Sequence, residues 1–538
     1  MAYRLSQLRT LLSHIRSEQA NILAALATDL KRHPTMSLLT EALHLIELTE
    51  YVIGNLSGWM KGEQREYPAL FIPANAYVTY EPMGVALIMG SWNFPFDVTL
   101  GPLIFAIAAG NTAFVKPSEL SPASSQVMQS ICSALDQDCY RLVQGGPETA
   151  EALINLKWDV IFFTGSTEKG KLVAAAAARN LVRFEGELGG KNPTIVDKDA
   201  DISNAALRIV QGRMLNLGQL CISPEYVMVH KSVAGKLEAA LLATIRDFYG
   251  SDPSKSIDYG RMINTGHSQR VARLLESHGG EVLCGGNVDI SQKYIAPTII
   301  RNPNPRSALM NEEVFGPVLA IWQFEDITEC IDYINSKERP LAVYYFGSVN
   351  KKKVLERTNS GTFVQNETAF QYTICDLPFG GVGGSGSGKY HGIEGFRCMS
   401  NAKSVFEKDT FNGFPISLRY PPHDGSKSAM LLKLKQTVSL TNGELKRGAM
   451  RLFLLLALIG AIYQGYVSRT VGGPVLGLVV LGAPQGLEWV VPCVLGILAY
   501  DCVKEGKVEG RQGDNWGVYI STVLAGLLVW RAVERFRQ

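Results

Sequence analysis

Apolar residues near the N-terminus recur every three or four positions, with polar residues between them. This spacing is typical of an amphipathic helix with one buried face. The positions that follow it are Leu5, Leu8, Leu11, Leu12 and Ile15. We therefore predict two amphipathic helices over residues 3–31 and 38–60, with a break near Pro34, because proline disrupts a helix interior. The stretch lacks the continuous apolar core of a secretory signal.

From residue 84 onward, short runs of continuous apolar residues alternate with longer helical stretches. Such runs suit parallel strands that are buried on both faces of a sheet. The strands predicted in this way are 84–90, 112–116, 159–165, 192–198, 226–231 and 317–322. Helices are predicted between them, as over 98–109 and 121–136. The alternation predicts an α/β fold with a doubly wound sheet, preceded by a hairpin or edge ribbon over 67–82.

The pattern changes again after about residue 420, where a linker leads into a short basic amphipathic stretch. Residues 452–467 then contain no charged residue. Extended back to Met450, this run makes about 27 Å of helix, close to the ~30 Å hydrocarbon core of a bilayer. Shorter apolar segments follow at 475–483, 490–500 and 518–530. We expect the tail to attach to a membrane, with a soluble helical appendage as the alternative.

Composition narrows the classes of function. The chain has 52 Lys and Arg against 50 Asp and Glu, so a nucleic-acid partner is not expected. The nine cysteines include no CxxC pair and the eight histidines no HExxH, so neither a disulfide framework nor a metal site is predicted. This cysteine usage suits a reducing compartment. Lys446, Arg447 and Arg451 precede the first apolar run, which places that side in the cytosol.

Two clusters of candidate chemistry directly follow predicted strands. Asn93, after the strand 84–90, could donate an N–H to a developing oxyanion, or it could simply form a turn before Pro95. Lys116 and Glu119, at the end of the next strand, could hydrogen-bond the ribose hydroxyls of a nucleotide, or could belong to a solvated loop.

Two further clusters contain glycine. Gly165, Ser166 and Gly170 lie where a strand leads into a helix, whose free N–H groups and dipole favour a pyrophosphate. The alternative is an ordinary strand–turn–helix corner. Glu187 lies 34 residues before Cys221, which suits a general base and a thiol nucleophile. A cysteine is, however, more often a buried apolar residue.

The clusters occur together in an order that resembles the aldehyde dehydrogenase superfamily, and most closely its class 3 branch, the fatty aldehyde dehydrogenases. The resemblance covers about residues 3–410. The motifs that carry it are GSWNFPF, AIAAGNTAFVKPSELS, LDQDCYRLVQGG, FFTGSTEKGK, ELGGKNP, GQLC, EEVFGPV and LPFGGVGGSGSGKYHG. The chain departs from the usual pattern at Leu220, where a small residue such as Thr is common, and at Gly384, where Asn is common.

The resemblance implies an aldehyde dehydrogenase fold with several parts: an NAD-binding domain (1–66 and 83–187), a bridging and oligomerisation element (67–82 and 395–415), a catalytic domain (188–394), a linker with the basic segment (416–449) and a hydrophobic membrane tail (450–538). It also implies that Cys221 is the nucleophile, that Glu187 activates water, and that Asn93 helps to hold the oxyanion. The cofactor-binding residues that it implies are Trp92, Lys116, Glu119, Gly165, Ser166, Gly170, Leu188, Glu313 and Phe315. NAD is expected because the acidic Glu119 disfavours a 2′-phosphate, and NADP is possible.

The expected substrate is a long-chain aliphatic aldehyde, since a membrane-held enzyme collects aldehydes that partition into lipid. An apocarotenoid polyene aldehyde, as oxidised by fungal relatives, is the alternative. A thioacylating enzyme that uses coenzyme A would not need Glu187, and an inactive cofactor-binding protein would be expected to lack Cys221, Glu187 or Asn93. By resemblance the chain is a homodimer on an intracellular membrane such as the endoplasmic reticulum, with its catalytic part facing the cytosol.

Overall fold

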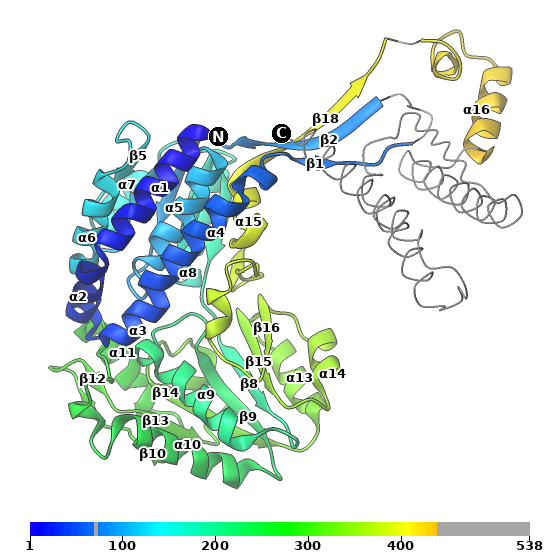
Figure 1. Cartoon of the computed structure of the whole chain (residues 1–538). Coiled ribbons are helices and arrows are strands. Elements are labelled where there is room, and N and C mark those ends of the chain that lie inside the picture. The colour runs from blue at the N-terminus through cyan, green and yellow to red at the C-terminus, as the bar shows by residue number, and fades with distance from the viewer. Residues whose placement is uncertain (69–70, 72–73, 411, 438–538) are drawn as a thin grey trace, which may run out of the picture. The chain divides into compact units, whose positions relative to one another are not determined.

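The computed structural model describes residues 1–68, 71, 74–410 and 412–437 (Figure 1). The apolar segments predicted from residue 452 onward therefore lie outside the described residues. Within the described ranges, no helix combines the length and apolar character needed to cross a bilayer.

The N-terminal pattern forms a succession of helices. They are α1 (Ala2–Ser17), α2 (Gln19–Leu30), α3 (Pro34–Ser37), a π-helical turn (Leu38–Ala42) and α4 (Leu43–Trp59). The predicted break near Pro34 is confirmed, and Pro34 occupies the first turn of α3, where its missing N–H costs nothing. The first predicted helix is divided at Glu18, which separates α1 from α2.

The first sheet carries the strands predicted at 84–90, 112–116 and 159–165. Its spatial order is β17 (Gly386–Ser387), β7 (Arg183–Glu187), β6 (Val160–Thr164), β3 (Val85–Met89), β4 (Thr112–Lys116) and β5 (Tyr140–Leu142). All are parallel except β17 at one edge. The helices that follow β3 to β6 are α5 (Asp97–Ala109), α6 (Pro122–Ser133), α7 (Pro147–Ile154) and α8 (Thr167–Arg179).

The order of this sheet reverses at β3. The chain proceeds from β3 to β4 and β5 on one side, and then returns to β6 and β7 on the other. Open α/β sheets bind ligands at such a switch point, beyond the carboxyl ends of the strands. The segments that begin there follow Met89 and Thr164, and they carry the predicted residues Asn93 and Gly165.

Helix α5 is buried around almost its whole circumference. It lies between the sheet and the N-terminal helices α1 and α4, and Val98 alone among its residues is partly exposed (Figure 1). This explains why its sequence, DVTLGPLIFAIAA, is apolar on every face rather than amphipathic. The arrangement fixes the start of α5, and with it the loop that carries Asn93.

A second, mostly parallel sheet contains the strands predicted at 192–198, 226–231 and 317–322. Its order is β10 (Glu281–Cys284), β13 (Thr298–Arg301), β14 (Val318–Phe324), β9 (Pro224–His230), β8 (Asn192–Val196), β15 (Ala342–Phe346) and β16 (Thr362–Gln365), with β10 antiparallel. Helices α9 (Ile202–Met214) and α10 (Ala234–Tyr249) cover one face, and α13 (Ile327–Asn335) and α14 (Lys351–Arg357) cover the other. An apolar core lies on each face of this sheet, and successive residues of β9 contribute alternately to the two cores, as expected for a strand buried on both faces.

Smaller elements complete this part of the chain. They are β11 (Val288–Asp289), β12 (Tyr294–Ile295), α11 (Thr265–Glu276), α12 (Ala308–Asn311), α15 (Gly392–Cys398), α16 (Gly425–Thr437) and 3-10 turns at Leu215–Gly218, Pro253–Lys255, Phe370–Thr373 and Ile416–Arg419. Helix α16 covers the stretch predicted to be basic and amphipathic. Its apolar residues include Met430, Leu431 and Leu432, which are consecutive and therefore spread around the helix instead of sharing one face.

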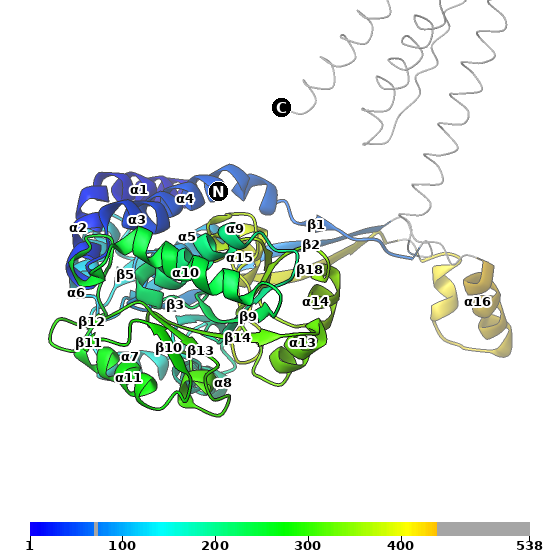
Figure 2. The same ribbon diagram turned by 90° about the horizontal axis from the view of Figure 1, so that it is seen from below.

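A third sheet is a long antiparallel ribbon. Strands β1 (Glu63–Gln64), β2 (Ala74–Pro82) and β18 (Ser400–Lys408) form it, and β2 pairs with β18 along its whole length. Residues 67–82 thus contribute one strand of a ribbon, with α15 at its base in both views (Figures 1 and 2). There, Arg397 of α15 donates to the Tyr80 hydroxyl at 3.1 Å.

Candidate active site

The three predicted catalytic groups come from three separate elements. Asn93 lies in the loop after β3, Glu187 is the last residue of β7, and Cys221 lies shortly before β9. Asn93 Nδ2 donates to the Gln219 carbonyl at 3.1 Å, which joins the first element to the third. The Glu187 carboxylate acts electrostatically on the Cys221 thiol. The structure therefore brings the three groups together between the two main sheets.

Cys221 is a partly exposed residue whose thiol lies in an environment that keeps it protonated. Burial, followed by the negative charges of Glu187 and Glu313, raises its pKa well above the usual range for a thiol. Its backbone carbonyl accepts from Asn192 Nδ2 at 2.8 Å. A Cβ on Gly218, whose φ is +70°, would lie 2.4 Å from the Gly316 carbonyl oxygen, so glycine is required in the turn before the thiol.

Glu187 is a buried carboxyl group without a full set of partners. Its Oε2 has no hydrogen-bond partner among the described residues. Burial raises the pKa of Glu187 to about 8, the positive charge of Lys389 lowers it, and Glu185 raises it. A carboxyl group with a pKa near neutrality can both take and return a proton, as a general base must.

Asn93 is oriented by its neighbours. Ser91 Oγ donates to Asn93 Oδ1 at 2.6 Å, which identifies the other side-chain atom as the NH₂ group. One N–H of that group bonds to Gln219. An amide nitrogen carries two hydrogens, so the second is available to an oxyanion beside Cys221.

A buried ion pair that the sequence did not suggest holds the backbone of Asn93. Arg32 Nη2 donates to the Asn93 carbonyl at 2.5 Å, and Asn216 Nδ2 donates to the same oxygen at 2.9 Å. The Arg32 guanidinium also pairs with Glu41, whose other oxygen accepts from the Phe96 N–H at 2.9 Å. This clamp fixes both Asn93 and the start of α5. A glutamate inside the apolar pattern LLTEALHL was the available signal.

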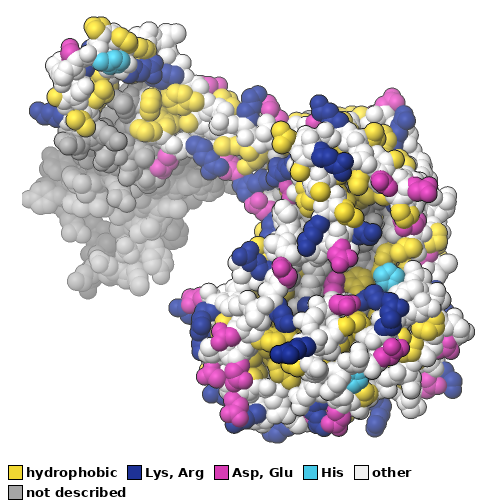
Figure 3. Space-filling model, turned by 180° about the vertical axis from the view of Figure 1, so that it is seen from behind, with side chains coloured by type: hydrophobic (Ala, Val, Ile, Leu, Met, Phe, Trp, Pro, Cys, Tyr) yellow, Lys and Arg dark blue, Asp and Glu magenta, His cyan; other side chains and the backbone are white. Residues whose placement is uncertain are grey.

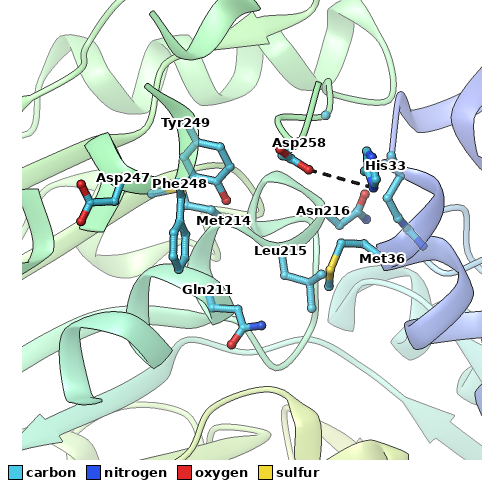
Figure 4. A pocket seen from close by; sticks show the side chains of 12 residues that line it. His33, Met36, Gln211, Met214, Leu215, Asn216, Asp247, Phe248, Tyr249 and Asp258 are labelled. Atoms are coloured by element: carbon cyan, nitrogen blue, oxygen red, sulfur yellow. Dashed lines mark ion pairs between the residues drawn. The ribbon is translucent and has the colours of Figure 1, made fainter. Parts of the chain in front are cut away.

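Arg32 and Asn216 also contribute to the wall of a cavity of about 390 Å³. The cavity lies between the α2–α3 junction and the ends of α9 and α10, and His33 and Asp258 face each other across it at 4.0 Å (Figure 4). Met36 and Phe248 form apolar parts of the cavity wall. None of the predicted site residues lines it, but two of its polar groups hold the Asn93 carbonyl.

The predicted adenosine and pyrophosphate contacts meet at the carboxyl edge of the first sheet. Lys116 ends β4, and its buried ammonium lies 3.3 Å from a carboxylate oxygen of the half-exposed Glu119. Gly165 follows β6, and Ser166 caps α8 by accepting from the backbone N–H of Lys169 at 3.4 Å. A helix N-terminus beside a Lys–Glu pair suits a dinucleotide, with phosphate at the helix and ribose at the pair.

Close packing explains two of the other predicted cofactor residues. A Cβ on Gly170 would lie 2.5 Å from Leu188 Cδ2, so a larger residue at position 170 would force the Leu188 side chain to move. Leu188 itself is buried, and its N–H donates to the Ser385 carbonyl at 3.1 Å.

Glu313 and Phe315 approach from the loop before β14. Glu313 Oε1 accepts from the Gly190 N–H at 3.2 Å, and burial raises the pKa of Glu313 to about 8. Phe315 has a left-handed φ of +46°, and its ring packs edge-on against Trp92 with a centroid distance of 5.4 Å. Phe315 thus lies beside Trp92, and Glu313 lies beside the segment that follows Glu187.

Buried charges that the sequence did not suggest hold this loop. Lys191 Nζ donates to the Glu312 carbonyl at 2.9 Å, and Glu225 accepts from the Val314 N–H at 2.8 Å. Glu225 also pairs with Arg213 at 2.7 Å. Burial raises the pKa of Glu225, but the positive charges of Arg213 and Lys191 outweigh burial and lower the pKa to about 2. The face of the molecule drawn in Figure 3 carries interspersed positive and negative side chains.

Comparison with known proteins identifies the family. The model of the aldehyde dehydrogenase family matches residues 1–405. Aldehyde dehydrogenase family 3 member A2 of Rattus norvegicus is 38% identical over 464 residues, which cover 85% of this chain and 94% of that protein. The dimeric NADP-preferring aldehyde dehydrogenase of Canis lupus familiaris is 39% identical over 426 residues, covering 78% and 93%. The substrate-bound AldH of Staphylococcus aureus superimposes with a TM-score of 0.77 at 36% identity, covering 81% and 95%.

The chain belongs to the aldehyde dehydrogenase family. It is an oxidoreductase that oxidises aldehydes with NAD or NADP, so the predictions of an α/β aldehyde dehydrogenase fold, of the enzyme class and of the cofactor are confirmed. The membrane tail that was predicted with this fold lies outside the described residues. The similarity to family 3 enzymes supports the class 3 assignment and does not favour the apocarotenoid alternative.

Proposed function

We propose that the chain oxidises long-chain aliphatic aldehydes to carboxylic acids through a covalent intermediate on Cys221. The observation that carries the proposal is the meeting of a thiol, a buried carboxyl group and a carboxamide at one point. Cys221 packs against the largest apolar core of the described chain, next to the buried Leu220. An apolar surrounding favours a hydrophobic substrate, and Leu220 in place of a small residue adds to it.

In the first half-reaction, the Cys221 thiolate adds to the aldehyde carbon, an S–C bond forms, and the carbonyl electron pair moves to oxygen. The Glu187 carboxylate takes the thiol proton. The Asn93 side chain and the Cys221 backbone N–H stabilise the oxyanion. When bound, NAD(P) supplies the acceptor for the aldehyde hydride, so that this half-reaction ends in a thioester.

Before the second half-reaction, Glu187 passes the thiol proton to solvent and is ionised again. Glu187 then removes a proton from water, whose oxygen attacks the thioester carbon. The C–O bond forms, the C–S bond breaks, and Cys221 leaves as a thiolate. The carboxylic acid departs, and Glu187 returns its proton to the Cys221 thiolate, which restores the thiol. Because its pKa is raised, the thiol needs a base to lose its proton, and a carboxyl group that titrates near neutrality can act in both half-reactions.

For the cofactor, we infer that the part built on the first sheet binds it and that NAD is preferred over NADP. Lys116 and Glu119 would hold the adenosine ribose, and the Glu119 carboxylate would repel a 2′-phosphate. Ser166 and the start of α8 would hold the pyrophosphate. Trp92, Glu313 and Phe315 would border the nicotinamide end.

The substrate proposal predicts a dependence on aldehyde chain length. Each additional CH₂ is worth about 0.8 kcal/mol of apolar transfer, so kcat/KM should rise by about three- to fourfold per CH₂ until the pocket is filled. NADH formation measured from acetaldehyde to octadecanal, with benzaldehyde as a control, checks this, and the same series with NADP gives the cofactor preference. A kcat/KM that is flat or highest for short aldehydes would contradict the proposal.

Residues 450–538 are proposed to attach the enzyme to an intracellular membrane, such as the endoplasmic reticulum, with the catalytic part in the cytosol. The uncharged run 452–467 and the preceding Lys446 and Arg447 support this. We expect the full chain to float with lipid vesicles in a density gradient and a chain ending after residue 437 to stay at the bottom. Equal behaviour of the two chains would refute membrane attachment by the tail.

The protein is proposed to be a homodimer. One of its relatives is named as a dimeric enzyme. The ribbon supports the same assembly, because β18 is the edge strand of its sheet and most of its residues are exposed. Sedimentation equilibrium of the detergent-solubilised full chain should give twice the 58.8 kDa chain mass after correction for detergent. A single-chain mass at micromolar concentration would argue against it.

A further inference from the structure

Lys389 lies in a short antiparallel pairing beside the active site. The N–H of Phe379 donates to the Tyr390 carbonyl at 2.7 Å, and the N–H of Tyr390 donates back to Phe379 at 2.8 Å. This pairing brings Lys389 next to Gly380. The Lys389 ammonium donates to the Gly380 carbonyl and, at 3.3 Å, to the Gly361 carbonyl. The side chain is thus half-buried, with its cation held by backbone.

Glu187 reaches the same glycine. A Cβ on Gly380 would lie 2.7 Å from Glu187 Oε1 and 3.0 Å from Lys389 Cδ. The φ of Gly380 is +153°, a conformation that L side chains rarely adopt. The glycine therefore lets a carboxylate and a lysine stem approach one backbone position. The backbone of Glu187 pairs with Gly386 in β17, from the same glycine-rich segment as Lys389.

Among the described residues, Lys389 is the cation that interacts electrostatically with the Glu187 carboxyl group. Glu185, on the same strand, adds a negative charge, although Arg183 pairs with it at 2.6 Å. The other titratable neighbours that interact electrostatically with Glu187 are Cys221, Tyr390 and Cys398. All of them are neutral or negative, so none replaces the positive charge of Lys389.

We propose that Lys389 is a positioning residue for the catalytic base: its ammonium group favours the ionised form of Glu187, which is the form that removes a proton from water during thioester hydrolysis. This inference rests on the proposed role of Glu187. No proton moves to or from Lys389 in this step. The proton of water goes to Glu187, the C–O bond forms and the C–S bond breaks, as in the second half-reaction.

The expected effect is a shift of a pH profile. An opposite charge within about 4–6 Å lowers a carboxyl pKa by one to three units, and partial exposure of Lys389 places the expectation at the lower end. Loss of the cation raises the pKa of Glu187, so the limb over which hydrolysis increases with pH moves about one unit to the alkaline side. At about pH 7 this lowers the hydrolysis rate about five- to tenfold, and the difference closes at alkaline pH, where both bases are ionised.

The test is the pH dependence of acyl-enzyme hydrolysis in the full chain, measured with p-nitrophenyl acetate after the initial burst. Lys389→Gln removes the charge but keeps an N–H₂ group for the two carbonyls, and Lys389→Arg keeps the charge. We expect the alkaline shift in Lys389→Gln and a near-normal profile in Lys389→Arg. The control Lys352→Gln, an exposed α14 residue paired with Glu356, should leave the profile unchanged.

The outcomes separate a structural role from the proposed one. If Lys389→Gln lowers the rate equally at every pH, or leaves the profile unmoved, Lys389 is only an anchor for the loop and the inference is wrong. If Lys389→Gln does not fold, the Lys389→Arg profile decides, because retained charge must retain the pH limb. Glu187→Gln, measured in parallel, should abolish hydrolysis. If Glu187→Gln still hydrolyses the acyl-enzyme, the proposed base is wrong. If Glu187→Gln loses hydrolysis but the pH profile of Lys389→Gln does not move, only the role of Lys389 is rejected.

Discussion

Cys221→Ala is expected to lower kcat for aldehyde oxidation by about 10⁴-fold or more, because no covalent intermediate can form without the thiol. The fold should be unaffected, since only one sulfur atom is removed and the backbone contacts of residue 221, such as the bond from Asn192, remain. NADH formation with a long-chain aldehyde measures the loss. Calorimetric titration with NAD should show unchanged cofactor binding.

Cys284→Ala is the matched control for this variant. Cys284 is also a partly exposed cysteine, but it lies on the edge strand β10 of the second sheet and not beside Glu187. We expect activity within about twofold of the unmodified enzyme. Retained oxidation in Cys221→Ala, or equal losses in the two variants, would mean that the thiol chemistry has been assigned to the wrong residue.

The strands that were predicted from the sequence are short, mostly apolar runs, which suit burial on both faces of a sheet. Strand β15 (AVYYF) is of the same kind and fully buried, but it was not predicted. Strand β7 was not predicted. Its sequence, RFEGE, has no such run, since it contains the buried carboxyl groups of Glu185, which pairs with Arg183, and of Glu187, the proposed base. Burial of charge is decided by tertiary partners, and a local pattern therefore reports such a strand as polar.

The residues of the candidate site also differ in how far the sequence alone could predict them. Residues that belong to short local motifs, such as Asn93 after β3 and Ser166 at the start of α8, could be found from the sequence. The Arg32–Glu41 clamp and the approach of Lys389 to Glu187 could not, because each depends on contacts between segments far apart in the chain. Even Cys221, one of nine cysteines, needed a family resemblance to be distinguished from a buried apolar residue.

Glu187→Gln is expected to stop the reaction after the first turnover. Gln has the shape of Glu but cannot take a proton from water, so hydrolysis of the thioester should fall by about 10²- to 10⁴-fold. NADH should then form in a burst equal to the enzyme concentration, followed by very slow turnover, provided that solvent can take the thiol proton. Rapid-mixing absorbance measures the burst, and mass spectrometry of the intact protein should detect the acyl group on Cys221.

Glu185→Gln is the matched control, because Glu185 lies two residues earlier on β7 and is also buried. It should remove the Arg183 ion pair and leave thioester hydrolysis within a few-fold of normal. If NADH formation by Glu187→Gln has the same time course as that by the unmodified enzyme, another group activates the water. A burst of the same kind in Glu185→Gln would lead to the same conclusion.

The stability of Glu187→Gln provides an independent check on the environment of the base. The folded-state pKa of Glu187 is about 8, raised by burial from 4.5. Between these values the folded state binds the proton more tightly than the unfolded state, so the contribution of Glu187 to stability falls as pH rises through this window. Gln has no charge to bury. The melting temperature of Glu187→Gln relative to the unmodified enzyme should therefore increase from about pH 5 to about pH 8, which scanning calorimetry measures. A difference that does not change with pH would mean that the carboxyl group is not buried as the structure places it.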